Sequence, residues 1–160
     1  MIPAVIPVAG LGTRSLPISK AIPKEMQPIF DRPIIQYIVE EAVESGSERI
    51  ILVTSDDKQA IENHFKVIPG LEAALLKANK KDLHDLIYKL SRMVKVETVL
   101  QKQPLGLGHA VLMAKDLVTE SHFGVLLGDD MVEGTPPGLK QLINFYEMKK
   151  LSPDVGVVML

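Results

Sequence analysis

Residues 4–26 read AVIPVAGLGTRSLPISKAIPKEM. The first five of them, Ala4–Val8, are apolar and have the length of a strand, and Gly10 and Gly12 follow almost at once. Glycine accepts a positive φ and lets a ligand approach the backbone closely. Three cations come next, separated by prolines: Arg14, Lys20 and Lys24. Such a loop fits a polyphosphate, and it also fits a solvated surface turn.

Outward from this stretch, apolar runs of strand length alternate with helical patterns. The further predicted strands are Arg49–Thr54, Val96–Leu100, Gly124–Leu127 and Asp154–Leu160. The predicted helices are Pro33–Glu44, Lys58–Phe65 and Gly108–Leu117. Strands rich in β-branched residues that alternate with helices indicate a parallel sheet covered on both faces. We therefore predict an α/β fold, Rossmann-like, with a mostly parallel sheet and helices on both faces.

Two features complicate this pattern. Pro7 lies inside the first strand and cannot donate a ladder hydrogen bond, so either the strand pairs poorly there or the proline marks its end. The stretch Leu71–Met93 has the pattern of one or two amphipathic helices, which is more than one crossover needs. We interpret residues 66–95 as a helical insertion packed on one side, with a structural role such as a subunit contact.

Composition restricts the class of protein. The 160 residues are enough for one domain with a core, and no apolar run approaches the length of a membrane span. A net charge of −2 offers no long-range attraction to nucleic acid. The absence of cysteine excludes disulfides, thiolate nucleophiles and cysteine metal sites. The start of the chain does not resemble a signal peptide, so we predict a cytoplasmic protein with no nucleic-acid or membrane partner.

Two familiar glycine motifs do not fit the opening loop. A dinucleotide fingerprint would need a third glycine where Ser15 stands, followed at once by a helix that Pro17 and Pro23 disfavour. A P-loop would need a Gly-Lys-Ser/Thr triplet, which the loop lacks. What remains is an extended loop whose cations converge only if it wraps around a ligand.

The full string resembles the bacterial UTP–glucose-1-phosphate uridylyltransferases, which belong to the sugar-nucleotide pyrophosphorylase group of nucleotidyltransferases. The resemblance begins with GLGTR-x-x-P-x-S-K-A-I-P-K-E-M and continues through most of the chain. It includes Asp31-Arg32-Pro33, Ile35-Gln36-Tyr37, Ile61-Glu62-Asn63-His64-Phe65, Gly106-Leu107-Gly108-His109-Ala110 and Leu126-Leu127-Gly128-Asp129-Asp130. It implies a Rossmann-like sheet, Mg²⁺ as cofactor, UTP and a sugar 1-phosphate as substrates, and a homo-oligomer in the complete protein.

The resemblance also implies roles for individual residues. Nucleotide-binding positions would be Ala9, Gly10, Leu11, Gly12, Glu25, Gln101 and Gly106. Catalytic positions would be Arg14 and Lys24, which match triphosphate-binding cations, and Asp129, which matches the metal ligand. Read without the resemblance, Glu25 is a surface partner of a neighbouring lysine.

Some of these roles have support from the residues themselves. An amide both donates and accepts, as the imide edge of uracil requires. The resemblance favours Gln101 over Gln103, because the spacing from Gln101 to Gly106 matches that of the family glutamine. Asp129 and Asp130 follow an apolar strand, and Mg²⁺ sites commonly use one or two carboxylates with phosphate oxygens and water. The alternative interpretations are a tight turn before a helix at Gly106 and capping chemistry at the two aspartates. His109 is expected to be a packed or capping residue.

The implied reaction joins UTP and glucose 1-phosphate to give UDP-glucose and pyrophosphate. The family continues beyond the point where this chain stops, and DVGVVML ends inside an apolar run whose cover would be another subunit or absent sequence. We therefore expect the chain to be the UTP- and Mg²⁺-binding half of a truncated enzyme, inactive or nearly so alone. The alternatives are a non-catalytic regulatory paralogue or partner subunit, and a pyrophosphorylase for another nucleotide or sugar.

Overall fold

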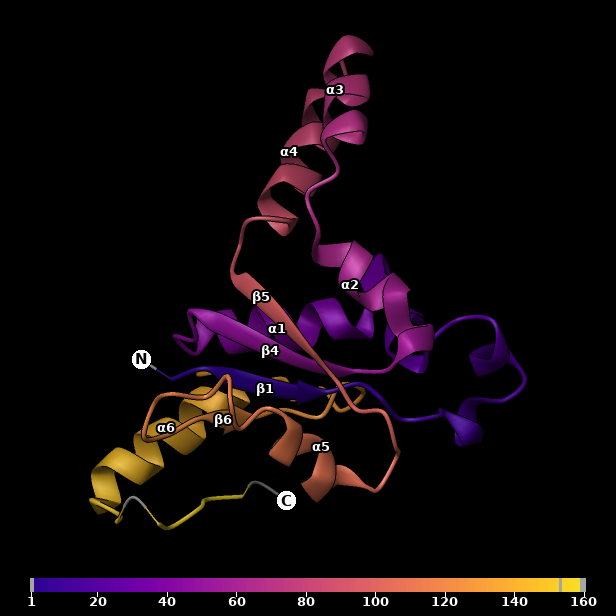
Figure 1. The fold of residues 1–160 in the computed structure, drawn as a ribbon. Coiled ribbons are helices and arrows are strands. Elements are labelled where there is room, and N and C mark those ends of the chain that lie inside the picture. The colour runs from indigo at the N-terminus through magenta and orange to yellow at the C-terminus, as the bar shows by residue number, and fades with distance from the viewer. Residues whose placement is uncertain (1, 153, 159–160) are drawn as a thin grey trace.

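The computed structural model describes residues 2–152 and 154–158. At its centre lies a four-stranded sheet in the order β5-β4-β1-β6, and the pairings between these strands are parallel (Figure 1). The strands are β1 (Ala4–Pro7), β4 (Arg49–Thr54), β5 (Lys95–Leu100) and β6 (Gly124–Val125). The four strands predicted before residue 130 are confirmed, although β6 is shorter than predicted.

Helices cover both faces of the sheet. One face packs against α1 (Ile34–Glu44), α2 (Gln59–Phe65) and α6 (Gly138–Lys149), and the other against α5 (Leu107–Met113). Side chains of β4 alternate between the two faces because successive residues of a strand point to opposite sides. Ile50 therefore belongs to the larger buried cluster and Ile51 to the smaller one. The predicted α/β architecture is confirmed.

The first helix follows its predicted pattern. Its buried side chains recur at helical spacing, and they are Ile35, Ile38, Val39 and Ala42. The helix ends at Ser45, and Gly46 beyond it takes a φ of 98°, a conformation that favours glycine. In contrast, α5 ends earlier than predicted, since the chain from Ala114 onward forms turns.

The long loop after β1 is built from three short 3₁₀ turns. They are η1 (Thr13–Ser15), η2 (Ile18–Lys20) and η3 (Lys24–Met26), and a fourth, η4 (Asp56–Lys58), follows β4. The prolines of the loop disfavour a continuous helix, as expected from their fixed φ and missing N–H. Within residues 2–152 and 154–158, every helix is too short or too polar to pass through a membrane.

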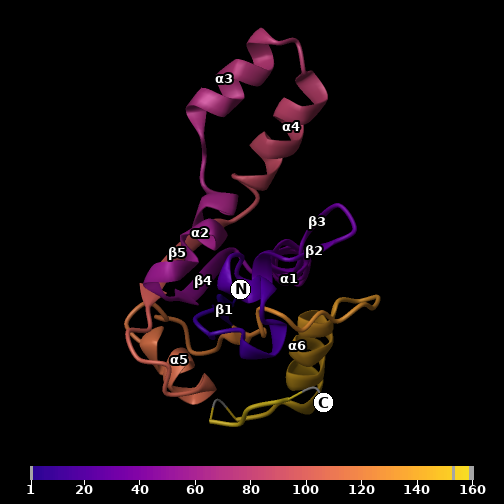
Figure 2. The same cartoon turned by 90° about the vertical axis from the view of Figure 1, so that its right-hand side faces the viewer.

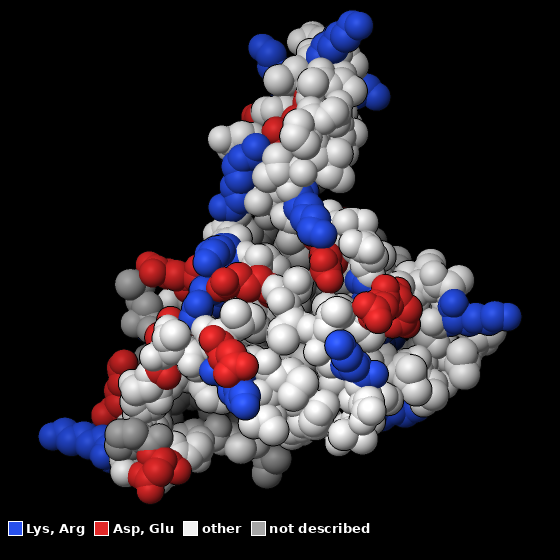
Figure 3. All heavy atoms as spheres, viewed as in Figure 1, with Lys and Arg blue, Asp and Glu red and all other residues white. Residues whose placement is uncertain are grey.

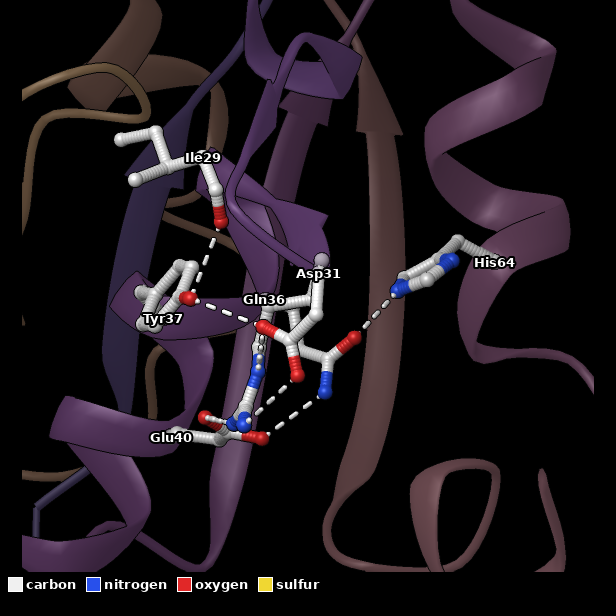
Figure 4. A network of polar contacts seen from close by, with 7 residues as sticks. Ile29, Asp31, Gln36, Tyr37, Glu40 and His64 are labelled. Carbon is white, nitrogen blue, oxygen red and sulfur yellow. Dashed lines mark hydrogen bonds and ion pairs between the residues drawn. The ribbon is translucent and has the colours of Figure 1, made fainter. Parts of the chain in front are cut away.

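A small antiparallel hairpin then leads into α1. It consists of β2 (Pro28–Ile29) and β3 (Arg32–Pro33). The hydroxyl of Tyr37 on α1 contacts the carbonyl oxygen of Ile29 at 3.0 Å and a carboxylate oxygen of Asp31 at 3.1 Å (Figure 4). These contacts fix the hairpin against the first helix.

The same network continues to α2. Arg32 Nη1 donates to Glu40 at 2.8 Å, and Gln36 Nε2 donates to the other carboxylate oxygen of Glu40 at 2.9 Å. His64 Nε2 lies 2.9 Å from Gln36 Oε1, an oxygen that only accepts (Figure 4). Burial lowers the pKa of His64, which favours the neutral ring with its proton on Nε2. Several residues of the family resemblance therefore serve to join the hairpin, α1 and α2.

Two helices form an arm that projects away from the sheet (Figures 1 and 2). They are α3 (Pro69–Lys77) and α4 (Lys81–Leu90), and neither contains a buried residue. Arg92 joins their bases by holding both carboxylate oxygens of Glu72, at 2.7 and 3.2 Å. Lys and Arg side chains gather at the far end of the arm (Figure 3). The two amphipathic helices expected here are present, but they pack on each other and extend outward instead of covering the sheet.

Two other expectations are settled by the strand pairing. Pro7 marks the end of β1, and Val8 beyond it resumes bonding by donating its N–H to Val53 O at 2.8 Å. The strand predicted over Asp154–Leu160 is wrong for residues 154–158, which form no strand and are mostly exposed. This segment runs beyond α6, apart from the sheet, so it has no neighbouring strand to pair with (Figures 1 and 2). Residues 159–160 lie outside the described part of the chain.

Candidate functional site

The order of the strands reverses at β1, and we call the region outside the carboxyl ends of β1 and β6, between Lys24 and Asp129, the crevice. The connections from β1 lead outward on one side of the sheet through β4 to β5, whereas β6 lies on the other side of β1. In open α/β sheets, ligands bind at such a reversal, outside the carboxyl ends of the strands. The loop that starts at Val8 and the turn that carries Asp129 both begin at this point.

An ion pair lies across this crevice. Lys24 Nζ donates to Asp129 Oδ2 at 2.6 Å. This hydrogen bond joins two residues that lie 105 positions apart in the chain. Both side chains keep access to solvent, with exposed fractions of 23% and 41%. Solvent screening limits the contribution of such a pair to stability, so each partner remains available to a ligand of opposite charge.

Beneath this pair lies a second, buried ion pair. The side chain of Glu25 is 1% exposed, and Lys58 Nζ donates to its Oε2 at 2.8 Å. The other oxygen, Oε1, lies 4.0 Å from Lys24 Nζ. Burial raises the pKa of Glu25, while the hydrogen bond and charge of Lys58 act in the opposite direction.

Gly12 gives the glycine loop its shape. Its φ of 64° lies in the left-handed region, and its carbonyl accepts a 2.7 Å hydrogen bond from Ser19 Oγ. A Cβ added at Gly12 would lie 3.1 Å from Ser19 Cβ. Ala9 is buried, whereas Gly10 and Leu11 are exposed at the mouth of the crevice. The loop therefore offers free backbone to a ligand beside Lys24.

Gly128 brings the aspartate turn against the end of β1. A Cβ at this position would lie 2.6 Å from Val8 Cγ1 and 3.1 Å from the carbonyl oxygen of Pro7. Only glycine allows this approach without displacement of the neighbouring chain. Asp129 therefore has its position set by the packing of the residue before it.

A second cluster of polar groups lies at the carboxyl end of β5. Gln101 is buried, and its backbone N–H donates to Thr54 O at 2.8 Å. Its side-chain Nε2 donates to His109 Nδ1 at 2.8 Å and to the carbonyl of Gly106 at 3.3 Å. Gly106 begins α5 with a φ of 96°. Gln103, in contrast, is exposed, and it lines a neighbouring hollow of about 300 Å³.

Arg14 stands apart from these clusters. It lies on the exposed turn η1, and within residues 2–152 and 154–158 its side chain makes no hydrogen bond or ion pair that would fix it. A guanidinium in this state is free to turn toward an anionic ligand. The structure thus brings Lys24 and Asp129 together and leaves Arg14 on the rim.

The described part of the chain forms no closed metal site. Across the described ranges, no three side chains of His, Cys, Asp or Glu lie close enough to hold a metal ion. Asp129 and Asp130 are both exposed at the open edge of the sheet. An Mg²⁺ site needs only one or two protein carboxylates when phosphates and water complete its shell, so this donor set fits such a metal.

Comparison with known proteins identifies the family of this chain. A family model described as "Nucleotidyl transferase" matches residues 3–159. The chain belongs to this family. The resemblance drawn from its motifs is thereby supported by a match over nearly the whole chain.

Individual relatives agree with this nucleotidyl transferase assignment. The UTP–glucose-1-phosphate uridylyltransferase of Bacillus subtilis is 52% identical over 154 residues, which cover 96% of this chain and 52% of that protein. Uridylyltransferase 2 of Staphylococcus saprophyticus is 50% identical over 144 residues, covering 90% and 50%. The chain spans about half the length of the curated relatives it matches.

Solved structures show the same fold. A UTP-bound UGPase from Acinetobacter baumannii has a TM-score of 0.87 at 50% identity, covering 94% of this chain and 54% of that one. A UDP-glucose pyrophosphorylase complexed with UDP-glucose has a TM-score of 0.78 at 39% identity, covering 94% and 55%. This nucleotidyl transferase chain therefore shares its fold with proteins solved with a nucleotide and with a nucleotide sugar.

The sequence patterns do not point to two residues of this candidate site. Lys58 was read only as the start of a helix, since no local pattern links it to Glu25, 33 residues earlier. Gly128 was read only as part of a motif, although a glycine between an apolar strand and two aspartates signals a close backbone approach. The expectation that His109 is a packed residue agrees with its hydrogen bond to Gln101.

Proposed function

We propose that this chain carries the UTP- and metal-binding half of a UTP–glucose-1-phosphate uridylyltransferase. The ion pair between Lys24 and Asp129 at the crevice is the observation that supports this most, because it joins the cation that the family resemblance assigns to phosphate binding to the carboxylate that it assigns to the metal. The names of the relatives supply the substrates, UTP and glucose 1-phosphate. The products would be UDP-glucose and pyrophosphate.

The proposed reaction is an in-line displacement. A phosphate oxygen of glucose 1-phosphate attacks the α-phosphorus of UTP, and the bond to the β-phosphate oxygen breaks as pyrophosphate leaves. The attacking oxygen is already anionic at neutral pH, so the site needs neither a general base nor a covalent intermediate. Catalysis then depends on positioning and on charge neutralisation, both of which Lys24 and Arg14 would supply.

The other half of the site would hold the nucleoside. Backbone groups of the loop Ala9–Gly12, which begins at a buried residue and opens at Gly10 and Leu11, would contact the base and ribose. Gln101 is held by Gly106 and His109, so its amide is oriented before a ligand arrives. A preoriented amide loses little entropy when it recognises the uracil edge. We also assign Glu25 to this part of the site, although its carboxylate is already held by Lys58.

Asp129 would hold Mg²⁺ together with phosphate oxygens of the nucleotide. The metal would supply neutralisation of the phosphate charge. In the free protein Lys24 neutralises Asp129, so the ammonium of Lys24 would turn from this carboxylate to the phosphates when the metal binds.

Calorimetric titration of the chain with UTP, dTTP and UDP-glucose, each with and without Mg²⁺, tests the proposal. We expect UTP to bind more tightly with Mg²⁺ than without it, and more tightly than dTTP. Asp129→Ala should remove the effect of Mg²⁺, whereas Asp130→Ala, which removes the adjacent exposed carboxylate, should keep it. Unchanged Mg²⁺ dependence in Asp129→Ala would refute the ligand assignment. Absence of nucleotide binding would favour a partner-binding role instead.

A further inference from the structure

Lys58 occupies an unusual position for a lysine. It ends η4, directly after β4, and its side chain is only 5% exposed. Lysine is almost never fully buried unless a partner compensates its charge. That partner is Glu25, at 2.8 Å, which comes from the loop after β1. The pair therefore ties together the loops of two adjacent strands under the floor of the crevice.

Glu25 in turn lies directly beneath the Lys24–Asp129 pair. Its Oε1 is 4.0 Å from Lys24 Nζ, and its Cγ is 3.4 Å from the place that a Cβ on Gly128 would take. Lys24 Nζ thus has two carboxylates within reach, Asp129 at 2.6 Å and Glu25 at 4.0 Å. Two anions compete for one ammonium group.

The competition depends on what neutralises Glu25. A carboxylate taken out of water is stabilised by the nearest cation, and the interaction of charges strengthens as the local dielectric constant falls. Because Lys58 already donates a hydrogen bond to Glu25 and neutralises its charge, this carboxylate attracts Lys24 only weakly. The ammonium of Lys24 therefore faces outward, to the anion at the mouth of the crevice.

We propose that Lys58 is a positioning residue: by saturating Glu25 from below, it keeps the Lys24 ammonium directed toward Asp129 and the phosphates of a bound nucleotide. Without Lys58, the buried Glu25 would draw Lys24 inward, away from the mouth of the crevice. Lys58 itself would touch neither nucleotide nor metal. The phosphate part of this inference rests on the proposed function, whereas the placement of Lys24 in the free protein does not.

Lys58→Met removes the charge and keeps a long apolar stem. We expect a ligand-free crystal structure of this variant to show Lys24 Nζ hydrogen-bonded to the carboxylate of Glu25 and no longer to that of Asp129. We also expect the calorimetric affinity for Mg²⁺ and UTP to fall by about 10- to 100-fold, the usual effect of removing a group that orients a binding residue. Lys24 still paired with Asp129 in the crystal would overturn the inference.

The neutral double variant Glu25→Gln with Lys58→Met separates positioning from other roles. It removes both buried charges, so nothing remains to draw Lys24 inward, and Lys24 Nζ should pair with Asp129 again in the crystal structure. Lys24 Nζ still turned away from Asp129 in the double variant would overturn the inference. If Lys58→Met does not fold, the crystal structure of the double variant alone decides, because it should fold and keep Lys24 on Asp129.

Lys66→Met is the matched control. Lys66 also pairs with a glutamate, Glu62 at 3.1 Å, but its side chain is 53% exposed and lies outside the crevice. This variant should leave both Lys24 and the nucleotide affinity unchanged. If the original chain binds no UTP, the proposed function fails, and the crystal structure of Lys58→Met still tests where Lys24 points.

Discussion

At the scale of single residues, Gly128 determines where Asp129 lies, although it has no side chain of its own. It separates the last apolar residues of the β6 segment from Asp129, and it packs against the backbone of Pro7. A methyl group there meets the short, buried side chain of Val8 and the carbonyl oxygen of Pro7, neither of which can move aside as the end of a flexible side chain could. The position of Asp129 is therefore coupled to the end of β1.

We predict that Gly128→Ala lowers the free energy of unfolding by about 1–3 kcal/mol, the usual cost of overpacking. Urea unfolding measures this change. Gly70→Ala is the control, since a Cβ at Gly70 has nothing within 4 Å, and alanine in a helix should raise stability by up to about 1 kcal/mol. Equal midpoints for the two variants would contradict the packing at Gly128.

Residue patterns point to the exposed part of the candidate site and not to its buried part. Gly12 and Lys24 lie in the loop after one predicted strand and Asp129 follows another, whereas their roles are what the family resemblance implies. The patterns do not indicate the pair between Lys58 and Glu25, since it forms only when the loops of β1 and β4 come together. A buried ion pair leaves no periodic signal, and Glu25 by itself looked like a surface residue.

At the scale of elements, the arm is held by contacts within itself. Two nitrogens of Arg92 donate hydrogen bonds to the carboxylate of Glu72. The guanidinium carbon of Arg92 lies 3.9 Å from the centre of the Tyr88 ring. These groups connect the base of α4 to the start of α3. Leu90, the last residue of α4, packs against the large core cluster, so the part of the arm beyond this base can loosen with little effect on the sheet.

We predict that Glu72→Gln increases amide hydrogen exchange in α3 and α4 while exchange in β4 stays unchanged. The hydrogen bond with Arg92 lowers the pKa of Glu72, so this stabilisation is present above the ordinary glutamate pKa of 4.5. It is lost as the pH falls through the lower pKa of the folded state. The original arm should accordingly loosen in acid.

Lys77→Gln is the control, because Lys77 is an exposed residue at the end of the same helix. It should leave the exchange of both helices as it was. Faster exchange in β4 for Glu72→Gln would show that the arm is not independent of the sheet.

Elements with a strong internal period were the easiest to predict. The apolar stripe of α1 and the buried run of β4 gave their positions to within one residue. Both α6 and the β2–β3 hairpin were missed. A helical pattern is present in α6, in Leu139, Leu142, Ile143 and Tyr146. The two prolines directly before it are typical of a loop. The hairpin is only two residues on each side and depends on contacts with α1.

At the scale of the whole molecule, the two faces of the sheet are covered unequally. Three helices and a large buried cluster lie on one face, and α5 with a small cluster lies on the other. Ile50 and Ile51 offer a direct comparison, since they are neighbours on β4, equally buried, and point to opposite faces.

We predict that Ile50→Ala destabilises the protein more than Ile51→Ala, with both costs within about 2–5 kcal/mol. A cavity in the large cluster is enclosed by several elements that cannot all close on it, whereas α5 alone can settle toward the gap left by Ile51. Urea unfolding of the two variants under one set of conditions gives the difference. A larger cost for Ile51→Ala would contradict this account of the core.

Through the Lys24–Asp129 contact, the crevice contains a cation and an anion that already neutralise each other. A bare anion gains little there, because it must separate the pair and leave the aspartate without a counter-charge. A triphosphate that arrives with its own divalent cation brings a replacement partner for each side. Under the proposed function, binding would exchange the partners of both ions, and the crevice would discriminate against free phosphate before any base or sugar is recognised.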